Sequence, residues 1–290
     1  MAKPSRRAAL ALAPLALLVS QTASAAWQFS PYVEARQTYT DNLRQAASER
    51  AQGEWITELT PGFRLSNYGQ RVRFDATYRL HYFTGTDDSS GESDRAQSVL
   101  AANLNAVLVD DWLYFDGAAS IGQRPISAFG PRASRSFSTV NSAEVRTWRA
   151  SPYLRHRFGS TATAELRYEA DSVDNGRIGL GNSDGHTASF RLDSGSRFSD
   201  FGWNVLVRER RIDYEVAPET AESTAQLGLR YALGRTLAVT GSVGYDKFDY
   251  QALGGVTEGR SWTTGLSWTP GQRTRVDASV GRRFYGDSYF

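Results

Sequence analysis

The chain has no cysteine, one methionine and three histidines among its 290 residues. Without cysteine it forms no disulfide, no thiolate nucleophile and no cysteine-ligated metal site. This absence fits an oxidising compartment, where unpaired thiols are a liability. The sequence also has no run of ~18 consecutive apolar residues beyond its N-terminus, so we predict no transmembrane helix there.

The first 25 residues have the order of a secretory signal peptide. A positive start, MAKPSRR, precedes the apolar run AALALAPLALLV, and Ala23-Ser24-Ala25 has the small-x-small form of a cleavage site. A membrane anchor is the weaker alternative, because the apolar run is too short to span a bilayer. We therefore predict a cleaved signal peptide over residues 1–25 and one domain over residues 26–290. Removing the leader changes the net charge from +2 to −1, which gives no reason to expect nucleic-acid binding.

What the sequence has in plenty is aromatic residues and glycine, with 14 Tyr, 14 Phe, 7 Trp and 26 Gly. This composition favours strands and turns. In RVRFDATYRLHYF, residues 71–83, the even positions are all apolar and the odd positions are almost all polar or charged. Such period-two alternation predicts a β-strand with two different faces. The same pattern predicts strands over 27–40, 55–66, 71–83, 96–108, 112–123, 145–158, 161–172, 186–196, 202–213, 223–233, 236–249, 260–269 and 273–285.

The predicted strands are long, and the gaps between them alternate between short and long. Each strand is close to the ~9–11 residues that a tilted strand needs to cross a bilayer. Short turns at one rim and long loops at the other are typical of a transmembrane barrel. We therefore predict an all-β fold, an antiparallel transmembrane β-barrel of about 12–14 strands. A soluble β-sandwich or propeller is the alternative, but its strands are usually half as long.

Alternation then divides the side chains between lipid and lumen. The residues that we expect to face lipid are Phe74, Tyr78, Leu80, Leu166, Tyr168, Leu227, Leu229, Val239 and Val243. The charged residues that we expect to face the lumen are Arg71, Arg73, Asp75, Arg79, Arg149, Arg155, Glu165, Arg167, Glu169, Arg191 and Asp193. The tryptophans that we expect near strand ends, in interfacial girdles, are Trp55, Trp112, Trp148, Trp203, Trp262 and Trp268. Two alternatives follow: the lumen conducts or binds anionic sugars, or its ion pairs form a plug that keeps a small barrel shut.

The number of predicted strands is unusual for a closed barrel. Bacterial single-chain barrels have an even number of strands, whereas the count here is odd. The last predicted strand rises toward the outer rim, and the terminal Phe290 falls where an outer loop belongs. Either the count is wrong by one strand, or the barrel is incomplete at the C-terminus.

Several short motifs resemble the PEP-CTERM system-associated outer membrane β-barrel proteins. The motifs are Tyr39-Thr40-Asp41-Asn42, Leu59-Thr60-Pro61-Gly62, Tyr78-Arg79-Leu80, Ser151-Pro152-Tyr153-Leu154 and Gly281-Arg282-Arg283-Phe284-Tyr285-Gly286. The resemblance implies a Gram-negative outer-membrane location and a link to exopolysaccharide and protein-sorting systems, with no established activity. Its members usually continue with more strands after the last motif, which this chain does not.

Together these features predict a non-enzymatic outer-membrane protein with a structural or transport-related role. One alternative is a porin-like channel for small or anionic solutes. The partners we expect are the lipid bilayer, lipopolysaccharide, the barrel-insertion machinery and exopolysaccharide export components, with no nucleic acid. We predict no cofactor and no metal site, and a solvated loop is favoured over a weak Ca²⁺ site for the acidic residues 87–94.

A second alternative is a lipid or peptide hydrolase at the outer rim. It would use His81, followed by Asp87 and Asp88, or the pair Asp184 and His186. His156 is predicted near the periplasmic end and is a poor candidate. No nucleophile elbow, zincin helix or spaced ligand set is present in the sequence, so polar residues at a wet rim explain these positions as well.

Overall fold

The computed structural model describes residues 27–40, 53–85, 94–125, 142–176, 181–250, 255–271 and 273–282. These residues form thirteen β-strands and one short 3₁₀ turn at Ser196–Phe198. The strands are β1 Gln28–Thr40, β2 Glu54–Tyr68, β3 Val72–Gly85, β4 Asp94–Val109, β5 Leu113–Pro125, β6 Ser142–Phe158, β7 Ala162–Asn175, β8 Ser183–Ser194, β9 Phe201–Tyr214, β10 Thr220–Ala232, β11 Leu237–Tyr250, β12 Gly255–Gly271 and β13 Thr274–Arg282.

All thirteen strands belong to one sheet in which each strand pairs antiparallel with its neighbours in sequence. This confirms the predicted all-β antiparallel fold, and the thirteen strands among the described residues fall within the predicted range of about 12–14. Every predicted strand overlaps an observed one, and most boundaries differ by only a few residues. The alternation predicted the strands well, because a one-residue slip in register would move every side chain of a strand to the opposite face of the sheet.

The turns at one end of the sheet, here called the short-turn end, are tight. Positive φ angles occur at Asp111, Gly159 and Gly234, each in one of these turns. At the opposite, long-loop end, the connections include residues 41–53, 86–93 and 126–141. The predicted contrast between the two ends weakens along the chain, because residues 215–219 and 251–254 are all that connect the later strands there.

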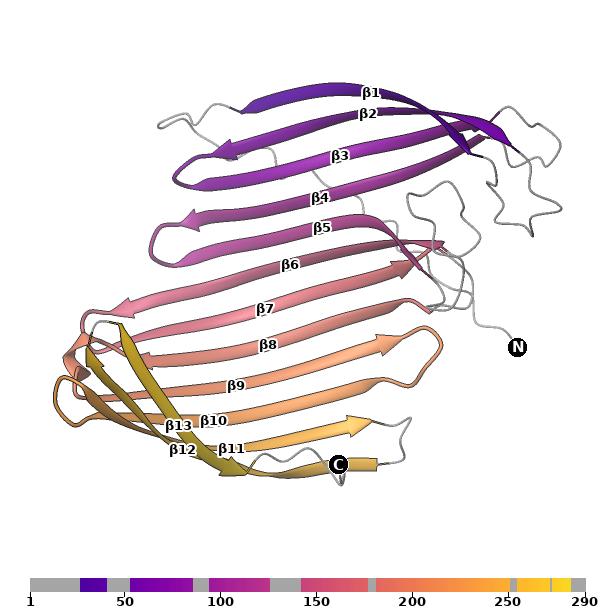
Figure 1. The fold of residues 1–290 in the computed structure, drawn as a ribbon. Helices are drawn as coiled ribbons and strands as arrows, with labels where there is room; N and C mark the ends of the chain where they lie inside the picture. The colour runs from indigo at the N-terminus through magenta and orange to yellow at the C-terminus, as the bar shows by residue number, and fades with distance from the viewer. Residues whose placement is uncertain are drawn as a thin grey trace.

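The sheet is curled rather than flat. In Figure 1 the middle strands lie farthest from the viewer, and β12 and β13 cross in front of β10 and β11. The viewer therefore looks into a concave face. Within the described residues the sheet is a single layer with no helix packed on it, and no helix there has the length and hydropathy of a membrane span.

The sheet has two edges, at β1 and β13, and the described residues of these strands pair only with β2 and β12. Consecutive strands alternate in direction, so β1 and β13 of a sheet of thirteen run the same way. A closed wall therefore needs either parallel pairing of β1 with β13 or strands other than the described ones.

Candidate functional site: the charged concave face

The strand registers divide the side chains into two sets across the whole sheet. Asp75 lies opposite Ser66 and Asn103, and Asp116 lies opposite Asn105 and Ser151. Followed strand by strand, this parity puts every residue predicted to face the lumen on one side of the sheet. All residues predicted to face lipid fall on the other side, so neither set is split.

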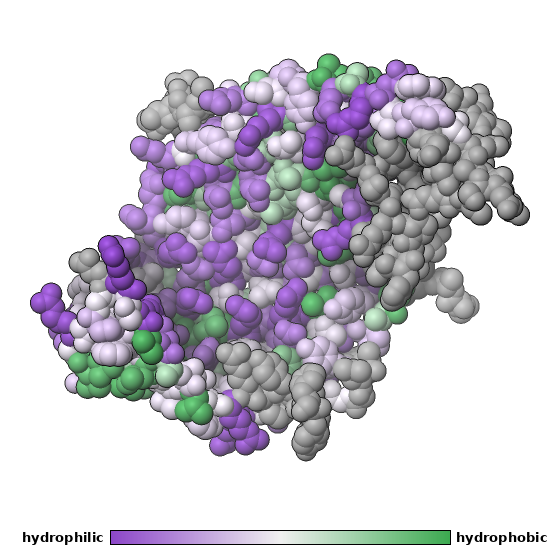
Figure 2. All heavy atoms as spheres, in the orientation of Figure 1, coloured by the Kyte–Doolittle hydropathy of each residue, from purple (hydrophilic) through white to green (hydrophobic). Residues whose placement is uncertain are grey.

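The polar side of the sheet is the concave one. Figure 2, in the same orientation as Figure 1, shows mostly hydrophilic residues across the visible hollow of β2 to β9. The opposite, convex side carries large apolar side chains that nothing described covers. Leu166 is 54% exposed, Val243 is 58% exposed and Leu227 is 40% exposed. The buried apolar residues are few and mostly small, such as Ala76, Ala162 and Ala238.

The best-connected group on the concave face is centred on Arg167 in β7. Its guanidinium donates from Nη1 to Asp116 Oδ2 at 2.9 Å and to Ser151 Oγ at 3.0 Å, and from Nε to Glu165 Oε1 at 2.9 Å. Glu165 also accepts two bonds from Arg155, from Nε at 2.9 Å and from Nη2 at 2.6 Å. We call these residues (Asp116, Ser151, Arg155, Glu165 and Arg167) the Arg167 network.

Aromatic rings support both arginines of this network. The Arg167 guanidinium carbon lies 3.8 Å from the centre of the Tyr153 ring, and that of Arg155 lies 5.2 Å from the same ring. Tyr114 stacks on Tyr153 with ring centroids 5.0 Å apart. Cation–π contact of this kind attracts a guanidinium to the face of the ring beside it.

Small residues in the middle strand allow charges two strands apart to meet. Ser151 in β6 is 1% exposed and lies between Asp116 in β5 and Arg167 in β7. Gly185 in β8 lies between Asp171 in β7 and Arg210 in β9, whose charged atoms are 3.9 Å apart. A Cβ at Gly185 would come within 2.6 Å of Asp171 Oδ1, so the Asp171 carboxylate occupies the space that a side chain at this position would take.

Other ion pairs are equally local. Arg64 meets Asp75 at 3.0 Å, Arg149 meets Glu169 at 3.6 Å, and Arg71, just before β3, pairs with Asp110 in the β4–β5 turn. Each ion pair in the described part of the chain joins residues at most two strands apart. Opposite charges on neighbouring strands therefore pair, as the sequence led us to expect, and these pairs lie along the wall and not across the space in front of it.

Several arginines on the concave face stay outside these pairs. Their side chains make no hydrogen bond or ion pair with another described residue, and we call them the unpaired arginines: Arg73, Arg79, Arg124, Arg157, Arg191, Arg208 and Arg230. The carboxylates on this face are mostly bonded, and Asp246, for example, accepts from Thr224 and Ser261. Among the described side chains, Asp193 is the one carboxylate there without such a partner. Hydroxyl partners do not neutralise Asp246 or Glu222, which accepts from the Tyr250 hydroxyl. The unpaired arginines still outnumber Asp193, Glu222 and Asp246, so the charge left outside ion pairs on this face is positive.

The histidines do not assemble the predicted hydrolytic sites. His81 Nδ1 lies 2.7 Å from Glu58 Oε1 and 3.3 Å from Thr60 Oγ1, so both partners approach the same nitrogen. A relay needs a partner on each ring nitrogen. His186 Nδ1 bonds the Tyr168 hydroxyl at 2.9 Å and makes no bond to Asp184. Asp87 and Asp88 lie outside the described residues.

The positions predicted for His156 and the tryptophans along their strands are correct in some cases and wrong in others. His156 lies near the short-turn end, as predicted, and stacks on Trp112 with ring centroids 4.0 Å apart. Trp55, Trp203 and Trp268 lie near strand ends. The expectation was wrong for Trp148 and Trp262, which lie well inside the long strands β6 and β12.

No group of three or more acidic or histidine residues that could hold a metal occurs in the described part of the chain. Most of the acidic loop 87–94 lies outside that part, as does the predicted signal peptide. Both therefore stay predictions.

No protein-family model and no curated protein match the chain. Similar solved structures include the FrpB iron transporter from Neisseria meningitidis (11% identity, TM-score 0.46), an anion-selective porin from Comamonas acidovorans (10%, 0.40) and a loop-deletion mutant of OmpT from Vibrio cholerae (12%, 0.38). The matches cover 87%, 88% and 90% of this chain and 45%, 88% and 93% of those chains, so this chain spans less than half the length of FrpB. At such identities and TM-scores we draw nothing about function from them.

Proposed function

We propose that this chain forms the wall of an outer-membrane β-barrel that works as a porin-like channel with a preference for small anions. The observation that carries the proposal is that the unpaired arginines of the concave face outnumber the carboxylates there that have no arginine partner. A pore lined in this way has a positive potential, which concentrates anions at its surface.

The membrane location is supported by the convex face. Leu166, Leu227 and Val243 are large, apolar and exposed at mid-strand, where a soluble protein would cover them with a second layer. In hydrocarbon such side chains cost nothing, and the backbone polar groups are paired from strand to strand. The predicted leader over residues 1–25 supports export to the outer membrane, with lipid, lipopolysaccharide and the insertion machinery as partners.

We favour an open channel over an ion-paired plug, because the ion pairs lie within the wall. The Arg167 network and the Asp171–Arg210 pair bind charges back onto the sheet. The link to exopolysaccharide and sorting systems is part of the proposal and is supported by the motif resemblance alone. A rim hydrolase is less favoured, because neither His81 nor His186 has partners on both sides of its ring.

Planar bilayer recording tests this proposal. The full chain, refolded in detergent and added to a bilayer, should give steady conductance steps, and under a KCl gradient the reversal potential should show chloride preference. A refolded protein that inserts but never conducts, or one that prefers potassium, would overturn the proposed channel.

A further inference from the structure

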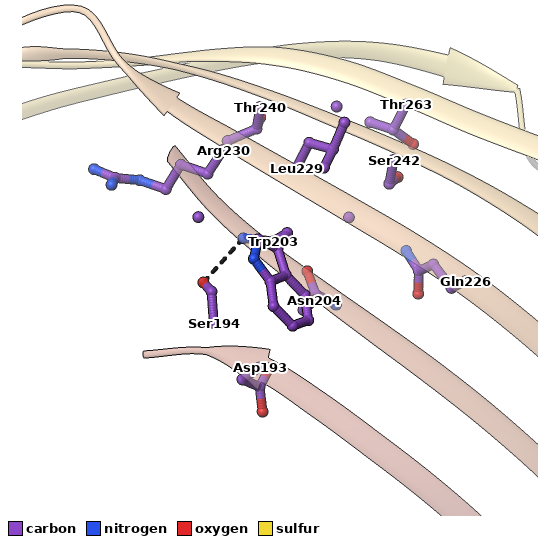
Figure 3. A pocket seen from close by; sticks show the side chains of 13 residues that line it. Asp193, Ser194, Trp203, Asn204, Gln226, Leu229, Arg230, Thr240, Ser242 and Thr263 are labelled. Carbon is purple, nitrogen blue, oxygen red and sulfur yellow. Dashed lines mark hydrogen bonds between the residues drawn. The ribbon is translucent and has the colours of Figure 1, made fainter. Parts of the chain in front are cut away.

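The second half of the concave face contains a hollow of about 490 Å³ near the short-turn end. Its floor and walls come from β8 to β12 (Figure 3). The register aligns one row of facing positions across these strands: Asp193, Asn204, Gly228, Ser242 and Thr263. The neighbouring row, toward the short-turn end, runs Gly202, Arg230 and Thr240.

Glycines create the depth of this hollow. Gly202 and Gly228 present no side chain where their neighbours in the same rows present amides, hydroxyls and a guanidinium. Gly228 is buried, and a Cβ added to it would overlap the Asn204 amide oxygen. The Asn204 amide therefore lies over Gly228, at the base of the hollow.

The polar groups around the hollow are not satisfied by one another. No side-chain hydrogen bond to another described residue is made by Asn204, Gln226, Arg230, Ser242 or Thr263. The polar residues of the Arg167 network, in contrast, are bonded together, and Asn105 donates to Asp116 at 2.8 Å. The Arg167 network is thus bonded internally, while the residues around this hollow present free side-chain donors and acceptors.

The arrangement of these groups specifies a ligand chemistry. Arg230 supplies a planar fork that matches one carboxylate. Asn204, Gln226, Ser242 and Thr263 both donate and accept, as hydroxyl groups require. Asp193, two strands from Arg230, can only accept when ionised, so it suits a ligand hydroxyl and opposes a second negative charge. A dianionic phosphate is therefore disfavoured.

We propose that this hollow is a binding subsite for a small solute that carries one carboxylate and several hydroxyl groups, a sugar acid in chemical class. This inference rests on the proposed function, because the solute would reach the hollow from the water in front of the concave face. Its test does not need conduction.

Isothermal titration calorimetry of the full chain in detergent, with sodium glucuronate as the probe, measures binding directly. Methyl glucoside supplies hydroxyls without the carboxylate, and acetate supplies the carboxylate without hydroxyls. We expect saturable binding of glucuronate and at least about tenfold weaker binding of each comparison compound. Methyl glucoside lacks the charge-assisted bond, which contributes more than the ~1.4 kcal/mol that equals tenfold, and acetate lacks several hydroxyl hydrogen bonds at once. Absent glucuronate binding, or acetate binding of equal strength, would overturn the subsite.

Two variants place the binding in the hollow. Arg230→Gln should weaken glucuronate binding at least about tenfold, and Asn204→Ala should weaken it several-fold. Arg73→Gln is the matched control: Arg73 is also an unpaired arginine of the concave face, but it lies in β3, away from the hollow. Circular dichroism checks that each variant keeps its sheet. Equal losses in Arg73→Gln and Arg230→Gln would mean that glucuronate follows general positive charge and would overturn the subsite.

Conductance separates the two proposals. A protein that binds glucuronate in detergent but never conducts retains the subsite and loses the channel. One that conducts anions without binding glucuronate retains the channel and loses the subsite.

Discussion

The guanidinium carbon of Arg167 lies over the ring of Tyr153, 3.8 Å from its centre, while the guanidinium bonds Asp116 two strands away. This contact fixes the arginine against the wall and joins β5, β6 and β7 through side chains as well as backbone. A charge held in this way stabilises the sheet and leaves the space in front of the concave face open.

Removing the Arg167 side-chain charge should therefore weaken the fold. In Arg167→Met, Asp116 and Glu165 lose a charged donor in a half-buried position, and we expect a loss of about 1–3 kcal/mol in the free energy of unfolding. Guanidinium unfolding of the protein in micelles, followed by tryptophan fluorescence, measures the change. Arg73→Met is the control, because Arg73 has no such partner among the described residues, and an equal loss there would contradict the role of the network.

Gly185→Ala tests whether glycine is needed between Asp171 and Arg210. The new methyl group would lie 2.6 and 2.7 Å from the two carboxylate oxygens of Asp171 and would force that side chain away. The Asp171 carboxylate is the end of a side chain and can move aside, so we expect a loss of up to about 1 kcal/mol in stability from the broken contact with Arg210. Gly122→Ala, also on the concave face, meets nothing within 4 Å and should be nearly neutral. Similar midpoints for the two variants in a denaturant titration would refute the close approach.

Leu227→Arg tests the assignment of the convex face to lipid. An arginine at mid-strand on a lipid-facing surface should cost about 2–4 kcal/mol near the bilayer centre. Gln226→Arg changes the adjacent residue of β10, on the concave face, and should cost far less because that side meets water. The measurement is reversible unfolding from lipid vesicles, and the assignment fails if Gln226→Arg is the more destabilising of the two.

The anion preference of the proposed channel should depend on ionic strength. The unpaired arginines act through space, and the Debye length falls from ~10 Å at 0.1 M salt to ~3 Å at 1 M. Reversal potentials at a constant KCl ratio should therefore show strong chloride preference at low salt and little at high salt. Arg73→Gln together with Arg79→Gln should lower the preference at low salt only; an unchanged preference in this double variant would exclude these arginines as its source.

A conducting pore also requires a closed wall. Cysteines introduced at Val33 in β1 and at Val276, Ala278 or Val280 in β13 all lie on the convex face, so one pairing should bring two sulfurs together if β1 and β13 meet. We expect a disulfide within one chain on oxidation in detergent, seen as a mobility change on a non-reducing gel. Disulfides formed only between chains would show that a second copy completes the wall.

The long alternating segments made the strands predictable, because one register alone keeps Phe74 and Leu80 on one face and Arg73 and Arg79 on the other. The turn at Gly159 was also readable from its residues. The ends of strands were harder to predict. β12 begins at Gly255, five residues before its predicted start, because its pairing with β11 extends beyond the segment that shows the hydrophobic pattern.

Which charges pair could not be read from the sequence. Alternation placed Asp116 and Arg167 on the concave side, but their contact depends on the stagger of three strands and on the small Ser151 between them. The hollow beside Gly228 was missed for the same reason, since its glycines and amides are scattered over β9 to β12. Only the register between these strands, which the sequence does not give, brings them together.

The sequence by itself determined that this chain is a sheet of long antiparallel strands with one apolar and one charged face, because period-two alternation is a local property of each segment. The tertiary structure decided the lateral register, and with it which arginines are bonded to carboxylates and which remain unpaired. That distinction is a matter of distances between strands, which no single strand contains.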